Sequence, residues 1–428
     1  MMKPSHSTFE RVIFGSYLLL VASLAIQKPS VTTFPGNKIT ATDLLFPLVA
    51  ALTMLGILIG AIPLRRTRAF IFLGAYAAAF LAATFFSPQI LQSLVKSLST
   101  TYLVGLAVIT FMLIRDERDL RRTIAVWLIG ASIPVVVGLF TIALFYYDAA
   151  NPLLIDLTYH FGAVPVGNFP RLSSTFVSAS MFCSYLIVTM MFYFIFAANR
   201  RLPTTVWILG LASILTCIVF TVSIGIGAAV LAIAMWVNYR IANRTVGRVV
   251  LISGIVVCVC SLLLSFVALQ PHSTAAYSLQ LPFIGIEITP SSRLMVWTDA
   301  VNTFLNHFLI GNGPGMPSAS VVFQNSEGGF SLLTDAHNSF LSVATQTGII
   351  GLAAFVFLCC HLTATSFSKS HNTLMRFGLA IAFFAVFIVQ GLTNSLEDPR
   401  HLWVLTGMIL AADKIYGKEN AGNLSADL

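Results

Sequence analysis

The chain has 428 residues, of which 57% are hydrophobic and only 9% are charged. This composition is too apolar for a soluble domain, because one soluble core would leave many of the 34 phenylalanines uncovered. The formal net charge of +8 does not indicate nucleic-acid binding, since the basic residues fall in short turns between apolar runs. The sequence therefore predicts a polytopic membrane protein with no nucleic-acid partner.

Apolar runs long enough to cross a bilayer as helices recur along the whole chain. Continuous runs of this kind favour helices over the alternating pattern of a membrane barrel. We therefore predict an all-α integral membrane protein with about twelve transmembrane helices, forming a single domain over residues 1–428. The expected spans are residues 12–27, 41–62, 68–86, 99–114, 123–147, 175–198, 204–219, 221–238, 249–269, 338–361, 377–394 and 401–416.

The basic residues are divided unevenly between the two sides of this arrangement. With the N-terminus inside, 18 of the 24 lysines and arginines fall in inner segments, which is the bias typical of cytoplasmic loops. Both ends of the chain are therefore expected in the cytoplasm. The basic residues left outside are Lys28, Lys38, Lys96, Arg171, Arg293 and Arg400.

Two outer connections are longer than a turn, at residues 148–174 and 270–337. Connections as long as the second one are usually either functional or disordered. Its apolar stretches, such as LPFIGIEI and FLNHFLI, argue against disorder. We therefore expect the 270–337 loop to pack against the outer face of the helices and to carry the function.

The cysteines do not indicate a metal site or a disulfide. All six lie inside apolar runs, and none stands at ligand spacing from a histidine in a loop. We expect small core residues at these positions, and neither a metal nor a cofactor. The cysteines are Cys183, Cys217, Cys258, Cys260, Cys359 and Cys360.

An amphipathic helix is expected to begin near Arg293. It follows the sequence TPSS at 289–292, whose hydroxyl side chains are common at helix starts, and apolar residues including Trp297 then recur at helical spacing. Such a helix would lie along the membrane surface. Its first turn, together with the Arg293 guanidinium, suits a phosphate group. The alternative is an ion pair of Arg293 with Asp299 or Glu287.

His337 is the candidate catalytic residue. It stands at the entrance of the run 338–361, next to Asn338, with Asp335 two positions before it. A helix N-terminus disfavours the imidazolium form, so the ring stays neutral and can accept a proton from an attacking hydroxyl. Asp335 or another carboxylate would orient the ring. The alternative is a structural histidine at the membrane boundary.

Two other arginines lie at the outer boundary. Arg171 ends the first outer loop just before a membrane run, where a diphosphate head group would lie. The alternative for Arg171 is an anchor that reaches lipid phosphate. Arg400 follows Glu397 and Asp398, so a local salt bridge is expected there in preference to substrate binding. The glycines of GNGPG at 311–315 lack a nucleotide-binding motif, and we expect them to end the amphipathic helix and turn the chain.

Several of these elements occur together in a known order. Arg293-x-x-x-Trp297, LIGNGPG at 309–315, and His337-Asn338 followed by GIIGL at 348–352 together resemble the O-antigen ligase and polymerase family of bacterial surface-polysaccharide enzymes. RLSSTF at 171–176 resembles a second element of that family, and the helix layout is similar too. Two positions depart from the family pattern. Gln346 stands where many members carry glutamate, and IGIGA at 224–228 lacks an arginine that many carry.

The resemblance implies an O-antigen ligase on the periplasmic face of the bacterial inner membrane. Such an enzyme transfers a polysaccharide from undecaprenyl diphosphate to a sugar hydroxyl of lipid A–core, inverting the anomeric centre without metal, cofactor or nucleotide sugar. Its partners are therefore the carrier-linked glycan, lipid A–core and membrane lipids. The resemblance further implies His337 as the general base and Arg171 and Arg293 as diphosphate ligands. Trp297, Asn338 and Arg400 are the other expected substrate-binding residues.

Two other functions remain as alternatives. A polysaccharide polymerase of the same family would use a second carrier-linked repeat unit as acceptor. Polymerases often have two arginine-rich outer loops, whereas the loop 148–174 has a single arginine, which favours the ligase. A transporter of lipid-linked oligosaccharides is less favoured. It needs ionisable residues near the middle of the membrane, and the predicted spans contain almost none.

Overall fold

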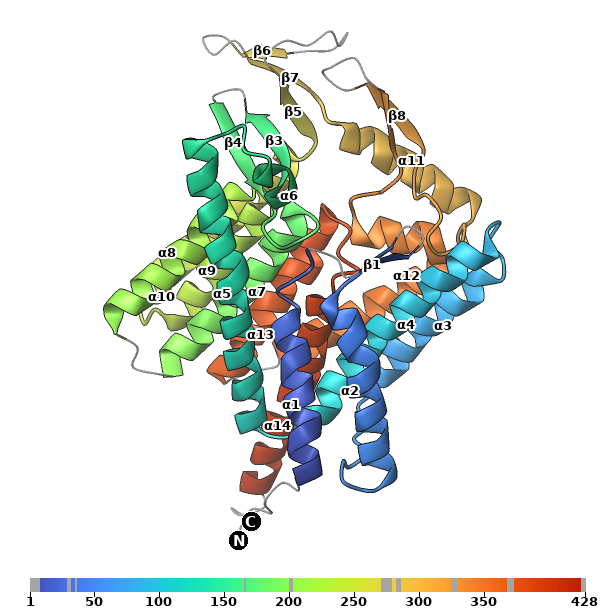
Figure 1. Ribbon diagram of the computed structural model, residues 1–428, viewed down its shortest axis with the longest axis vertical. Helices are drawn as coiled ribbons and strands as arrows, with labels where there is room; N and C mark the ends of the chain where they lie inside the picture. The colour runs from blue at the N-terminus through green and yellow to red at the C-terminus, as the bar shows by residue number, and fades with distance from the viewer. Residues whose placement is uncertain are drawn as a thin grey trace.

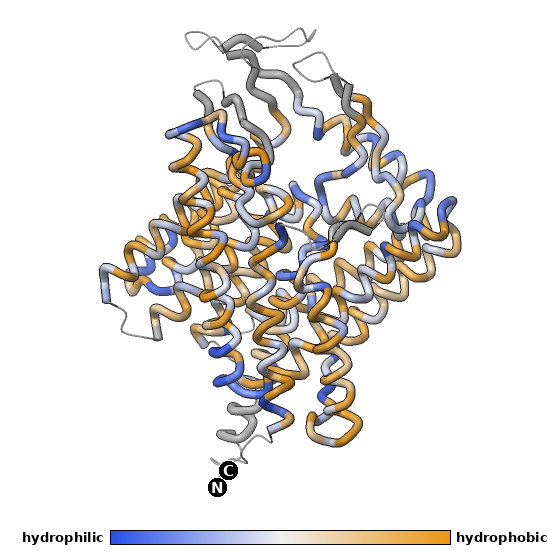
Figure 2. The backbone as a smooth tube through the Cα atoms, viewed as in Figure 1, coloured by the Kyte–Doolittle hydropathy of each residue, from blue (hydrophilic) through white to orange (hydrophobic). Residues whose placement is uncertain are grey.

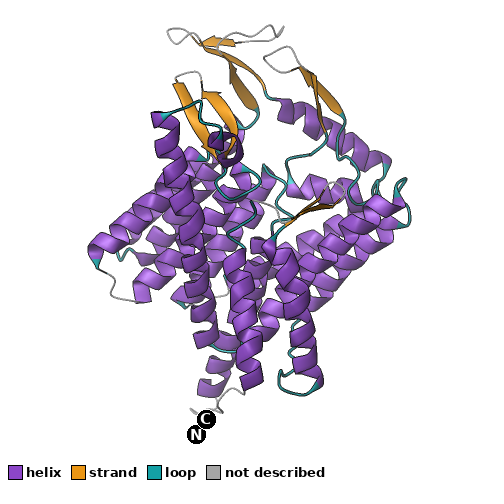
Figure 3. Cartoon of the chain, viewed as in Figure 1, coloured by secondary structure: helices purple, strands orange, loops and turns teal. Residues whose placement is uncertain are grey.

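The computed structural model describes residues 8–28, 32–34, 37–164, 167–199, 203–270, 279–281, 286–324, 330–367 and 373–424. These residues form a bundle of helices with short antiparallel strands gathered mainly at one end (Figure 3). The first helix begins and the last helix ends at the other end of the bundle (Figure 1). This placement agrees with the expectation that both ends of the chain lie on one side of the membrane.

A helix is found within each predicted apolar run. Pro134 lies inside the long helix α5, which continues on both sides of it. The helices of these runs are α1 (Thr8–Ser23), α2 (Ala41–Leu58), α3 (Ala69–Thr84), α4 (Ile90–Leu113), α5 (Glu117–Tyr147), α7 (Ala179–Asn199), α8 (Thr204–Phe220), α9 (Gly225–Arg240), α10 (Arg244–Leu264), α12 (Ser339–Ser366), α13 (Leu374–Phe383) with the turns Phe384–Val389 and Gln390–Leu392 after it, and α14 (Arg400–Leu424). A short helix, α6 (Leu153–Leu157), lies in the first outer loop.

The helices have the composition of membrane spans. In the described part of the chain, 7 helices are long and apolar enough to cross a membrane, and α3, α8 and α9 are shorter apolar helices. Hydrophobic residues dominate the middle of the bundle, and hydrophilic residues gather toward its ends (Figure 2). The protein is therefore a mostly helical membrane protein. That about twelve helices cross the bilayer remains a prediction.

The outer loops contain strands, which the sequence analysis did not predict. Chain segments outside helices still need partners for their backbone N–H and C=O groups, and neighbouring strands supply them. The apolar LPFIGIEI stretch contributes to one such sheet. The pairs are β1 (Thr32–Phe34) with β2 (Asn37–Ile39), β3 (Thr158–Val164) with β4 (Gly167–Leu172), β7 (Ile286–Pro290) between β5 (Val267–Gln270) and β6 (Leu279–Leu281), and β8 (Val321–Gln324) with β9 (Phe330–Leu333).

The core of the bundle joins α5, α7 and α14. The rings of Trp127 and Tyr185 stack with centroids 5.0 Å apart, and the Trp127 indole N–H donates to the Thr189 hydroxyl over 3.0 Å. His401, at the start of α14, is buried and its Nε2 lies 2.9 Å from the Ser184 hydroxyl. These contacts hold the beginning of α14 in the protein interior, and with it the segment 394–400.

The cysteine expectation is confirmed at four positions and wrong at two. Cys183, Cys217, Cys258 and Cys359 are buried, whereas Cys260 and Cys360 are exposed on the outer faces of their helices. Both exposed residues follow a buried cysteine closely in sequence. A helix turns by about 100° per residue, so such close neighbours face different directions.

Candidate active site

The helix α11 (Ser292–Asn306) places Arg293 in its first turn, as predicted. Ser291 occupies the cap position, but its hydroxyl does not cap the helix. It donates instead to the carbonyl of Ser265 over 2.8 Å, and the Ser291 N–H donates to the carbonyl of Phe266 over 2.9 Å. The serine therefore attaches the start of α11 to the end of α10, which fixes the position of Arg293.

The α11 helix is amphipathic in the predicted register, with much of its apolar stripe exposed. Leu294, Val301 and Leu305 are all exposed, whereas the buried residues are Val296 and Ala300 on another face. An exposed apolar stripe is what a helix lying on a lipid surface presents. This arrangement supports the expected position of α11 along the membrane boundary.

The structure brings the charges of Arg171, Arg293 and Asp335 near one another, although they come from three separate segments. The pKa of Arg293 is lowered to about 10, mainly by burial and further by the positive charge of Arg171. The negative charge of Asp335 partly offsets this by raising the pKa. Arg293 therefore stays charged at neutral pH. Two cations held against their mutual repulsion, with one carboxylate nearby, form a place that favours a multiply charged anion.

Arg293 and Trp297 both present buried donors that lack acceptors. Among the described residues, neither Nη1 of Arg293 nor Nε1 of Trp297 has a hydrogen-bond partner. The two residues are four apart on α11, so they lie on the same face. Asp299, the predicted alternative partner of Arg293, instead accepts the N–H of Ser320 over 2.7 Å. The side chain of Glu287, the other alternative, lies outside the described residues.

His337 stands directly before α12 and is oriented by Asp335. The Asp335 Oδ2 atom lies 3.2 Å from Nδ1 of His337, and Oδ1 accepts the His337 backbone N–H over 3.1 Å. Burial raises the pKa of Asp335, but the His337 ring and the Ser395 hydroxyl, 2.5 Å away, outweigh that effect and hold the pKa at about 2. Because a carboxylate only accepts hydrogen bonds, the ring proton lies on Nδ1. In the neutral ring, Nε2 is then the free base.

Asn338 has a structural role, whereas its substrate binding stays a prediction. It is the cap of α12, and its Oδ1 accepts the N–H groups of Phe340 and Leu341 over 2.9 and 3.1 Å. Its side chain is therefore occupied by the helix. His337 itself has a φ of +47°, a left-handed conformation that is uncommon outside glycine. This conformation turns the chain immediately before α12 and leaves the imidazole exposed.

The glycine-rich segment 309–315 is docked against a break in α12. The helix is interrupted at Gly348, where the Ile349 N–H donates to the carbonyl of Phe308 over 2.8 Å. The Asn312 N–H donates to the carbonyl of Thr345 over 2.7 Å. Gly311 has a φ of +82°, and a Cβ there would overlap the backbone of α12. The glycines therefore turn the chain as expected, and they also fasten the helix that carries Arg293 to the helix that follows His337.

Arg400 forms an ion pair, but not with its sequence neighbours. Its Nε and Nη2 atoms donate to the two carboxylate oxygens of Asp43 over 2.7 and 2.6 Å. Of the neighbouring acids, Asp398 pairs with Lys96 at 2.5 Å, and Glu397 contacts Ser342. The expected local salt bridge is therefore wrong. Asp43 is distant in the sequence, and the pair is brought together because α2 and α14 both pack against α4.

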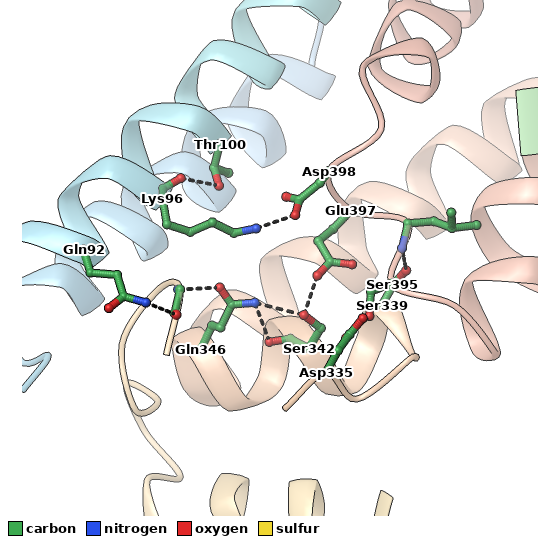
Figure 4. Close-up of polar contacts among 12 residues, drawn as sticks. Gln92, Lys96, Thr100, Asp335, Ser339, Ser342, Gln346, Ser395, Glu397 and Asp398 are labelled. Atoms are coloured by element: carbon green, nitrogen blue, oxygen red, sulfur yellow. Dashed lines mark hydrogen bonds and ion pairs between the residues drawn. The ribbon is translucent and has the colours of Figure 1, made fainter. Parts of the chain in front are cut away.

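A buried polar network connects α12 to the segment 394–400. The Ser342 hydroxyl donates to the carboxyl group of Glu397, and the Gln346 amide donates to the Ser342 hydroxyl over 2.9 Å (Figure 4). Gln346 Oε1 accepts the Gly315 N–H over 2.9 Å. One chain of hydrogen bonds thus joins three segments around the histidine. Gln346, which departs from the family pattern, supplies the link to the glycine-rich segment.

Glu397 is a residue of this site that the sequence analysis considered only as a partner of Arg400. Burial and the charge of Asp398 raise the pKa of Glu397 to about 8, so it is mostly protonated at neutral pH. Its Oε2 atom is buried without a hydrogen-bond partner among the described residues. No local motif marks Glu397, because its environment depends on how the segment 394–400 packs against α12.

The other outer histidines lie apart from this arrangement. His307 is exposed at the end of α11, and His401 is buried in the core. The side chains of His160 and His272 lie outside the described residues. Within the described part of the chain, no three His, Cys, Asp or Glu residues are grouped as metal ligands.

One comparison with known proteins found a match. Residues 221–356 match the family model of O-antigen ligase. This segment contains α11, the glycine-rich loop, His337 and the first half of α12, whereas Arg171 and Arg400 lie outside it. No curated protein matches the chain significantly. Over residues 221–356, about a third of its length, the chain is therefore similar to the O-antigen ligase family.

Proposed function

We propose that the protein is an O-antigen ligase. It transfers a polysaccharide from undecaprenyl diphosphate to a sugar hydroxyl of lipid A–core. The observation that carries this proposal is the meeting of Arg171 and Arg293 with the His337–Asp335 pair. Together these groups supply an anion site beside an oriented base, which are the two requirements for displacing a diphosphate by a hydroxyl.

The arginines bind the diphosphate of the donor. Arg293 offers a buried Nη1 that needs an acceptor, and the Trp297 indole N–H on the same helix face needs one as well. Diphosphate oxygens satisfy both donors, and Arg171 supplies a second positive charge. As the glycosyl–oxygen bond breaks, negative charge grows on the departing diphosphate. Preorganised cations stabilise that charge more strongly than the charge of the bound ground state.

His337 activates the acceptor. Its Nε2 atom takes the proton of the attacking sugar hydroxyl, while Asp335 holds Nδ1 and stabilises the imidazolium that forms. The hydroxyl oxygen bonds to the anomeric carbon from the face opposite the diphosphate, so the centre inverts. Undecaprenyl diphosphate leaves, and the proton on His337 is released to solvent.

The proposal includes the orientation of the protein in the bacterial inner membrane. About twelve helices span it, as a single domain over residues 1–428 with both ends in the cytoplasm. The loops 148–174 and 270–337 then lie in the periplasm. Three observations support this orientation. The basic residues fall mainly in the inner segments, and the start of α1 and the end of α14 lie at the same end of the bundle (Figure 1). The apolar stripe of α11 is exposed.

The decisive experiment supplies both substrates to the purified protein in nanodiscs. A ligase attaches the glycan from its carrier to lipid A–core, whereas a polymerase lengthens the carrier-linked chain without needing lipid A–core. Cells lacking the protein should accumulate long carrier-linked polymer. Accumulation of single repeat units in those cells, with chain growth in vitro, would replace this proposal by the polymerase.

A further inference from the structure

A cavity of about 780 Å³ opens between α4, the start of α7 and the segment that leads into α14. Lys96, Ser99 and Tyr102 line it from α4, Met181 from α7 and Asp398 from the last segment. Its wall contains both polar and apolar side chains. Cavities of this size, with a few placed polar groups, are typical ligand sites.

The cavity borders both halves of the proposed active site. On one side, the wall residue Gln27 donates its backbone N–H to the carbonyl of Thr175 over 2.9 Å, four residues after Arg171. On the other side, Asp398 directly follows Glu397, which contacts α12 just beyond His337. The cavity is therefore flanked by the segment that carries a diphosphate arginine and by the segment packed beside the base.

The charges around the cavity are compensated within the protein. The Lys96 ammonium is paired with Asp398 at 2.5 Å, as Figure 4 shows, and Arg400 is paired with Asp43 at 2.6 Å. The charges of these two cations are thus neutralised. A neutral, hydroxyl-rich ligand suits such a wall better than a diphosphate, because it can bond to ion pairs without separating them.

Gln27 gives an independent indication of a ligand. Gln27 is only 4% exposed, and no described residue forms a hydrogen bond with its side-chain amide. The amide therefore keeps its hydrogen-bonding capacity for a group in the cavity. Gln27 also lies in the cavity wall, so a bound hydroxyl is able to satisfy it.

We propose that this cavity binds neutral sugar residues of a glycan substrate, with the Gln27 amide bonded to a sugar hydroxyl. The inference rests on the proposed function, since it places a glycan beside the diphosphate site. The sugars belong either to the acceptor core or to the carrier-linked donor. Both present the same chemistry, so the experiment is designed to separate them.

The first test blocks the cavity without breaking a contact. Ser99 is exposed into the cavity, so Ser99→Trp fills it, whereas the neighbouring Leu98 is 57% exposed and does not line it. Leu98→Trp is therefore the matched control. Binding of core oligosaccharide and of glycan released from the carrier is measured separately by calorimetry. We expect Ser99→Trp to weaken one of them by roughly tenfold or more and Leu98→Trp to leave both unchanged.

The second test removes the amide of Gln27. Gln27→Leu keeps the side-chain size and deletes an unsatisfied polar group, so the melting temperature should stay the same or rise. Affinity for the same glycan should nevertheless fall roughly five- to tenfold, the usual effect of one hydrogen bond. A residue with only a structural role would not separate affinity from stability in this way.

The outcomes test the sugar site and the proposed ligase function separately. If both variants bind both glycans as the control does, the cavity is not a sugar site, even if the parent transfers glycan normally. If the parent binds glycan and the variants do not, the inference holds even where transfer to lipid A–core fails. The glycan whose affinity falls identifies the occupant as acceptor or donor.

Discussion

Nδ1 of His337 lies 3.2 Å from Oδ2 of Asp335, and the other oxygen of the same carboxylate accepts the His337 backbone N–H. One carboxylate thus fixes both the ring and the left-handed backbone of the histidine. The Ser395 hydroxyl holds this carboxylate from the segment before α14. The base is therefore positioned by two segments that are far apart in the sequence.

Replacement of His337 by alanine should strongly slow glycan transfer while leaving donor binding largely intact. The arginines supply donor affinity, whereas the histidine removes a proton only during the reaction. We expect transfer to fall by about two to four orders of magnitude, the usual contribution of general acid–base catalysis. His307→Ala, at the exposed histidine directly after α11, is the control. Single-turnover transfer within a few-fold of the parent would show that His337 is not the base.

Lysine should not replace Arg171 or Arg293. A lysine keeps the charge but loses the planar fork that binds two phosphate oxygens, so carrier affinity and transfer should both fall. At the exposed Arg121, near the start of α5, lysine should have no effect. Normal transfer by both site variants, at equal protein levels, would leave these arginines as point charges or anchors.

Alanine at Gly311 should undock the glycine-rich segment from α12. The residue combines a φ of +82° with a Cβ position that overlaps the backbone of Gln346, so both strain and a clash oppose the change. We expect a lower melting temperature and faster proteolysis of the segment. Gly74→Ala, where a Cβ would meet nothing within 4 Å, should be neutral or stabilising. Equal effects of the two changes would contradict the docking role.

Stability should depend on pH through Glu397. The pKa of the folded carboxyl is raised to about 8, whereas an unfolded glutamate titrates near about 4.3. Between these values the folded state holds a proton that the unfolded state releases, so stability falls as pH rises through this window. Glu397→Gln removes the effect, and its melting temperature should change less than that of the parent between about pH 5 and pH 8. Parallel pH curves for the two proteins would mean that Glu397 is ionised in the folded state.

The orientation in the membrane is testable with single cysteines. In a variant lacking the native cysteines, Ser320→Cys in the second outer loop should react with an impermeant thiol reagent on intact cells. Ala242→Cys, between α9 and α10, should react only after the cells are opened. Both residues are exposed in the structure, so access depends on the side of the membrane. Equal labelling of both in intact cells would overturn the proposed topology.

The sequence predicted the helical class because it is encoded locally. Runs of apolar residues interrupted by short polar turns are sufficient to place helices, and each predicted run contains one. The start of α11 near Arg293 follows from residues that are neighbours in the chain. For the same reason, the motifs that identify the family could be recognised without the structure.

Other features depend on contacts between distant segments, and local patterns do not report those. The hairpins of the outer loops were missed, since short strands are stabilised by their partners more than by their own sequence. The pairing of Arg400 was assigned to its acidic neighbours, whereas the packing of both α2 and α14 against α4 gives it Asp43. Glu397 was not recognised, because only its burial next to Asp398 changes its protonation.

The sequence by itself thus determined a helical membrane protein, its family motifs and the residue types that carry the chemistry, since these follow from composition and short spacings. Only the tertiary structure decided how these residues meet. It brought the charges of Arg171 and Arg293 together, oriented His337 through Asp335, and left the Gln27 amide without a partner in a cavity wall. Each of these depends on where helices distant in sequence pack, and packing is a property of the whole chain.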